Sequence, residues 1–179
     1  AELYAKRKDE RAKDNPDARC LPIGALQMLA HPLPKKILHN PSLLVILHKR
    51  NMEFRQIFLD GRRLPDDPQP SWYGYSTGRW EGDTLVVDVT NLDERTWLDR
   101  AGNFHSDALH VVERYTPIDA SHVMYEATLE DPKVFSRPWK ISMPLYRRID
   151  KSVKILEYEC VYYLQDKRYG NAKPVGVPQ

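Results

Sequence analysis

Residues 84–90 read Thr-Leu-Val-Val-Asp-Val-Thr, and this stretch decides the fold class. Leu85, Val87 and Val89 share one face of an extended chain, because successive side chains of a strand point to opposite sides. The other face carries Thr84, Val86, Asp88 and Thr90. An alternation of this kind is typical of a β-strand with one buried face.

The same period recurs on both sides of this stretch. Strand-like runs are 43–48, 54–59, 108–115, 123–129 and 139–145, and 154–164 closes the series. Residues 49–53 have the length of a hairpin connection, Asp60-Gly61 predicts a turn, and most other links are short and rich in turn residues. Roughly seven to nine consecutive strands therefore favour an antiparallel meander.

A meander of this size must hide its edges, because long open edges invite aggregation. We expect a mainly β fold, an antiparallel meander closed as a calycin-like barrel. A β-sandwich is the alternative, since the two folds share their sequence cues. The predicted organisation is a helical arm and proline-rich wrap over 1–41, an antiparallel β domain over 42–165 and a C-terminal tail over 166–179.

Composition excludes several classes of protein. A chain of 179 residues fits one domain, and 27 basic against 25 acidic residues are too balanced for a dedicated nucleic-acid binder. The longest aliphatic run, 43–47, is far shorter than the roughly twenty residues of a membrane-spanning helix. Two cysteines, Cys20 and Cys160, are compatible with one disulfide or with two separate thiols.

No metal ligand or cofactor is predicted. The six histidines form no HxH, HxxxH or HExxH pattern. Residues 74–78, Gly-Tyr-Ser-Thr-Gly, match the nucleophile-elbow pattern of hydrolases, but a proline-rich loop precedes them and a strand follows. We therefore interpret the two glycines as a bend before Trp80.

The stretch from 55 to 115 combines aromatic and polar residues in the proportions of a ligand site. The candidate ligand-binding residues are Arg55, Arg62, Trp72, Tyr73, Trp80, Trp97 and Arg114. The same residue types also fill the core of a small barrel or form structural ion pairs. If Asp88 points inward, then Asp88, Asp99 and His105 are candidate catalytic residues for proton transfer.

Residues 20–22, 54–62, 74–87, 95–99 and 130–133 together resemble a large uncharacterised family of exported proteins from acidobacteria and environmental proteobacteria. The resemblance covers about Pro16 to Cys160, although residues 24–27 depart from the family's usual loop. It implies export to the periplasm or beyond with the signal peptide removed, a chain trimmed at its N-terminus, and a Cys20–Cys160 disulfide. Gly78-Arg79-Trp80 before a strand also resembles the signature of lipocalin-type barrels.

From this we expect an exported β-barrel protein that binds a small hydrophobic or aromatic molecule. One alternative is a cofactor-independent hydrolase, lyase or isomerase that uses the same cavity. Another is a structural or accessory subunit of an extracytoplasmic complex, with a protein partner or a second copy of the chain. No nucleic-acid partner and no membrane-spanning segment are expected.

Overall fold

The computed structural model describes residues 2–64, 68–150, 152–157 and 160. The strands are β1 (Lys35–His39), β2 (Leu43–His48), β3 (Phe54–Phe58), β4 (Tyr75–Glu81), β5 (Thr84–Thr90), β6 (His110–Asp119), β7 (His122–Glu130) and β8 (Trp139–Tyr146). The helical elements are α1 (Glu2–Asp9), α2 (Ala25–Ala30) and the 3₁₀ turns η1 (Pro16–Arg19) and η2 (Arg50–Met52).

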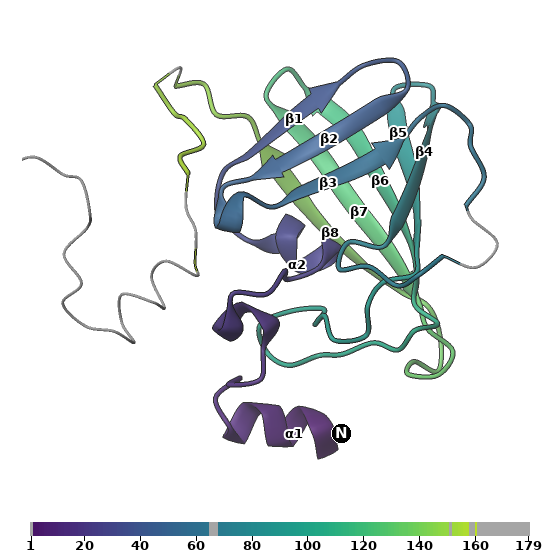
Figure 1. Ribbon diagram of the computed structural model, residues 1–179. Helices are drawn as coiled ribbons and strands as arrows, with labels where there is room; N and C mark the ends of the chain where they lie inside the picture. The colour runs from purple at the N-terminus through teal and green to yellow at the C-terminus, as the bar shows by residue number, and fades with distance from the viewer. Residues whose placement is uncertain (1, 65–67, 151, 158–159, 161–179) are drawn as a thin grey trace, which may run out of the picture.

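All eight strands form one sheet in chain order, which confirms the predicted meander. Neighbouring strands are antiparallel except β3 and β4, which are parallel and joined by the single bridge Phe58–Thr77. The sheet curls into an open half-barrel (Figure 1), and β1 and β8 are its two edges in the described part of the chain. Closure into a full barrel, as expected from the sequence, is therefore not seen there.

The hydrophobic core lies on the concave face of the sheet. Leu85, Val87 and Val89 of β5 are buried there, as their alternation predicts. Helix α2 lies against the open side of the curve (Figure 1) and adds Leu26 and Met28 to the same cluster. The half-barrel therefore holds its core between the curled sheet and a short helix.

Two strands were not predicted. β1 has four exposed residues out of five, so burial imposes no alternation on its sequence. β4 contains Gly78 and ends in exposed residues, which conceals its strand character. Residues 154–157 are not a strand, contrary to the prediction, and the rest of that predicted run, apart from Cys160, lies outside the described residues.

Cys20 and Cys160 form a disulfide with their Cα atoms 5.4 Å apart. The sequence was compatible with one disulfide or with two separate thiols, and the structure contains the disulfide. The bond joins the segment after η1 to a residue 140 positions further along the chain.

Among the described residues, none of the helices has the length and apolar composition needed to cross a bilayer.

Candidate functional site

Strands β3 and β4 diverge from their single bridge and leave an opening in the sheet. The connection between them contains Pro68 and Pro70, which have no amide hydrogen to extend a ladder. The amides of His48 and Leu59 pair across the β2–β3 interface with the carbonyls of Glu53 and Ser42. Since peptide groups alternate along a strand, those of Phe54 and Gln56 must face the opening instead.

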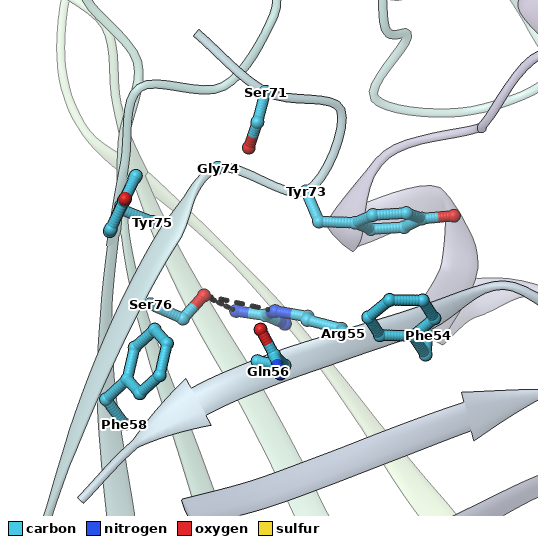
Figure 2. A pocket seen from close by; sticks show the side chains of 9 residues that line it. All are labelled: Phe54, Arg55, Gln56, Phe58, Ser71, Tyr73, Gly74, Tyr75 and Ser76. Atoms are coloured by element: carbon cyan, nitrogen blue, oxygen red, sulfur yellow. Dashed lines mark hydrogen bonds between the residues drawn. The ribbon is translucent and has the colours of Figure 1, made fainter. Parts of the chain in front are cut away.

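A pocket of about 270 Å³ occupies this opening (Figure 2). Its lining comes from β3, from the start of β4 and from the turn before β4: Phe54, Arg55, Gln56, Phe58, Ser71, Tyr73, Gly74, Tyr75 and Ser76. Four of these nine residues are aromatic. A concave site with aromatic walls and a few polar groups has the composition of a small-molecule site.

The turn before β4 depends on a glycine. Gly74 has a φ of +64°, and a Cβ at this position would lie 2.5 Å from the carbonyl oxygen of Thr90. Its amide donates to the Ser71 carbonyl at 3.1 Å, and that carbonyl also accepts from the Asp93 amide. The turn of residues 71–74 forms the upper wall of the pocket, and its backbone is therefore held by β5 and the chain that follows β5.

The floor of the pocket is polar and formed by Arg55 and Ser76. The Arg55 Nε and Nη2 groups donate to the Ser76 hydroxyl oxygen at 3.2 and 2.9 Å. Both residues are at most 2% exposed, although they line the pocket. Figure 2 shows the Ser76 hydroxyl meeting the guanidinium at the base of the opening.

Behind the floor, Arg55 forms a bidentate pair with Glu113 of β6. Nη1 donates to Oε1 at 2.9 Å and Nη2 to Oε2 at 2.7 Å. The Tyr125 hydroxyl of β7 donates to the same carboxylate at 2.8 Å. Burial alone would lower the pKa of Arg55, but the charge and hydrogen bonds of Glu113, together with Tyr115 and Tyr125, outweigh burial and raise the net pKa, so the arginine stays charged.

The tyrosines around this pair stay neutral. Burial, reinforced by the charge of Glu113, raises the pKa of Tyr115 and Tyr125 well above the usual value. At the side of the pocket, burial and then the Glu53 carboxylate raise the pKa of Tyr73. Burial also raises the pKa of Glu53 itself. The interior beside the pocket is therefore polar but close to neutral overall.

Ser71 supplies a hydroxyl from the opposite wall. Its amide donates to the Asn91 carbonyl at 3.0 Å, which fixes its backbone. Figure 2 shows its side chain pointing down toward the pocket. Within the described part of the chain, this hydroxyl has no hydrogen-bond partner, so it is free to meet a bound molecule.

The structure places two of the seven predicted ligand-binding residues, Arg55 and Tyr73, in the pocket. Arg62 lies at its edge, with the guanidinium carbon 3.9 Å from the ring centre of Phe58. Trp72 packs under Arg95 and does not line the pocket.

The other three predicted ligand-binding residues lie elsewhere. Trp80 is half exposed beside His39. Trp97 is buried under Arg7 of α1. Arg114 pairs with Glu81, on the face of β6 opposite Glu113.

Asp88, Asp99 and His105 have separate surroundings. Asp88 is on the face of β5 opposite the core, where its carboxylate binds Arg79 and His110, so the inward orientation considered from the sequence is not found. Asp99 accepts from the amides of its own turn. His105 is buried against Thr96 and the Ser106 carbonyl. The structure shows no contact that joins the three.

Glu113, Tyr125 and the pocket role of Ser76 were not predicted as site features. One signal was available, because Glu113 alternates with Val111 and Tyr115 on the apolar face of its strand. A carboxylate on a core-facing position needs a partner, and Arg55 has the same placement on β3. Ser76 lies inside β4, which continues into a hairpin, so the strand-to-helix turn of a nucleophile elbow is absent.

Comparison with known proteins gives no match to a family model, to a curated protein or to a solved structure. The described residues contain no cluster of three or more His, Cys, Asp or Glu side chains that could hold a metal ion.

Proposed function

We propose that this protein binds a small molecule with an aromatic or otherwise apolar body in the pocket between β3 and β4. The observation that carries the proposal is the opening itself, where aromatic walls stand over a buried polar floor. Native proteins usually cover or blunt an unpaired strand edge, and a bound molecule between β3 and β4 would cover this one.

The volume of the pocket sets the size of the molecule. About 270 Å³ is just below the roughly 300–1,000 Å³ of ordinary ligand sites, which limits the molecule to one or two fused rings. Phe54, which lines the pocket, is 56% exposed. A ring inserted between β3 and β4 would cover part of it.

Export and a closed calycin-like barrel belong to the same proposal. The disulfide supports export, because such bonds persist mainly in oxidising compartments. The arrangement of the eight strands in chain order within one curled sheet supports the calycin-like barrel. Proton-transfer catalysis has less support, since the three residues proposed for it do not converge.

The proposal is tested with 2-acetylnaphthalene as a defined aromatic probe, by saturation-transfer NMR and by titration calorimetry. Wild-type protein should bind it. Gln56 lines the pocket and is exposed, so the larger indole of Gln56→Trp would fill the opening and should weaken binding at least tenfold. Lys140→Trp, at an exposed position of β8, is the matched control and should bind as wild type does. Equal affinity of all three proteins would exclude this pocket as the site.

A further inference from the structure

We infer that the ligand of this pocket is uncharged at its buried end and presents a hydrogen-bond acceptor, such as the oxygen of a ketone, ester or amide, to the Ser76 hydroxyl. This inference rests on the proposed function and specifies the chemical class of the ligand. It follows from the hydrogen bonds that the pocket floor already makes.

Ser76 can offer a donor but not an acceptor. A serine hydroxyl has two lone pairs and one hydrogen. Two N–H groups of Arg55, Nε and Nη2, point at the hydroxyl oxygen and occupy its lone pairs. The hydroxyl hydrogen has no acceptor among the described residues, so it remains available at the pocket surface. Donation from a charged guanidinium also polarises the hydroxyl and strengthens it as a donor.

Arg55 itself is not available to bind an anion. Its Nη1 and Nη2 groups hold the Glu113 carboxylate, and Nε and Nη2 hold Ser76. The guanidinium side chain is 1% exposed and its charge is matched by an equally buried carboxylate. A ligand carboxylate placed at the floor would meet a neutral pair and would lose its hydration without gaining a cation.

The other pocket residues add no free charge. Arg55 is the only Arg, Lys, Asp, Glu or His among the residues that line the pocket. At the edge, Arg62 lies on the Phe58 ring, and its Nε and Nη2 groups donate to Oδ1 and Oδ2 of Asp60, which neutralises its charge. The pocket therefore selects against both anions and cations at its floor.

The opposite wall of the pocket offers a second polar contact. The Ser71 hydroxyl points toward the pocket and can donate or accept. Gln56 offers an amide at the open side, where its side chain is exposed. A ligand with an aromatic ring between these groups and a carbonyl directed at Ser76 would accept the hydrogen bond that the Ser76 hydroxyl can donate. It would leave no charge unpaired.

Three benzene derivatives of similar size separate the possibilities: acetophenone, which has a neutral acceptor, benzoate, which has an anionic one, and ethylbenzene, which has none. Each is titrated into wild type, Gln56→Trp, Lys140→Trp and Ser76→Ala, and affinity is read from saturation-transfer NMR. Acetophenone should bind wild type at least fivefold more tightly than ethylbenzene and at least tenfold more tightly than benzoate. Ser76→Ala should weaken acetophenone about fivefold and leave ethylbenzene unchanged.

The outcomes distinguish the two proposals. If no compound binds, or if Gln56→Trp weakens none of them relative to Lys140→Trp, the proposed function fails. If binding depends on Gln56 but benzoate equals or exceeds acetophenone, the pocket is a site and the inference about its chemistry is wrong. An equal loss of acetophenone and ethylbenzene in Ser76→Ala would assign Ser76 a structural role and would also overturn the inference.

Discussion

Arg55 Nη2 and Glu113 Oε2 are 2.7 Å apart, with side chains 1% and 0% exposed. The two residues belong to β3 and β6, so this ion pair spans the concave interior of the half-barrel. Neither charge reaches water, and each depends on the other for compensation. The pair therefore connects the stability of the interior to the geometry of the pocket floor.

We expect Glu113→Gln to lower the free energy of unfolding by about 3–5 kcal/mol, because it leaves the Arg55 charge buried without a counter-charge. Urea unfolding followed by tryptophan fluorescence measures this. Glu81→Gln is the matched control: it removes a carboxylate from the exposed pairs with Arg79 and Arg114 and should change the midpoint little. Equal midpoints for Glu113→Gln and wild type would show that the interior pair is not needed.

A second prediction concerns His48, which is 1% exposed and has no hydrogen-bond partner for either ring nitrogen among the described residues. Its ring packs edge-on against His31, 5.6 Å between centres. Burial, together with the charges of Lys35 and His31, lowers the pKa of His48 from 6.5 to about 4. The folded protein therefore holds this imidazole neutral.

Below pH 6.5 the unfolded chain takes up a proton at His48 that the folded chain refuses until about pH 4. The contribution of His48 to the free energy of unfolding should therefore fall across this window, by about 2–3 kcal/mol between pH 7 and pH 4.5. His48→Leu should remove this loss, whereas His39→Leu, at an exposed position, should retain it. Denaturant titrations at the two pH values measure the difference, and parallel behaviour of His48→Leu and wild type would contradict the assignment.

The sequence predicts most of the sheet and little of the site. Strands such as β5 and β7 alternate because one face is buried, and a period of two is directly visible in residue order. β1 has no buried face, and β4 contains a glycine against which Leu59 and Ile57 pack, so neither displays the period. The alternation of apolar and polar residues therefore identifies a strand only where one face of that strand is buried.

The site depends on contacts between residues far apart in the chain. Arg55 and Glu113 are separated by 58 positions, and only the order of strands in the curled sheet brings them together. Asp88 was favoured because it is a carboxylate on a polar face, but a polar face is where solvent and surface partners are found. Glu113 is on the apolar face, which is the stronger indication of a buried polar contact.

A third prediction uses two glycines with similar backbone conformations. Gly74 and Gly61 have φ angles of +64° and +74°, so an alanine at either position adopts an unfavourable left-handed conformation. Only at Gly74 does a Cβ also meet other atoms, the carbonyl oxygen of Thr90 at 2.5 Å and the side chain of Leu92. At Gly61 nothing lies within 4 Å.

Gly74→Ala should therefore be less stable than Gly61→Ala by about 1–3 kcal/mol, the usual cost of forcing extra volume into a packed region. Thermal or urea unfolding of the two variants gives this difference. Because the displaced backbone forms the upper wall of the pocket, Gly74→Ala should also weaken the binding of 2-acetylnaphthalene, whereas Gly61→Ala should not. Two variants of equal stability would mean that the turn relaxes without cost.

The last prediction concerns the Cys20–Cys160 disulfide. Because its cysteines are 140 positions apart, the bond restricts nearly the whole unfolded chain, and loop-closure entropy makes such a long-range cross-link strongly stabilising. We expect Cys20→Ala/Cys160→Ala to lower the free energy of unfolding by about 2–5 kcal/mol. Dithiothreitol should destabilise wild type by a similar amount and leave the double variant unchanged. A double variant as stable as the oxidised wild type, or one still sensitive to dithiothreitol, would contradict this account. Pocket binding in the double variant should persist below its unfolding transition, because no pocket residue belongs to the two segments that the bond joins.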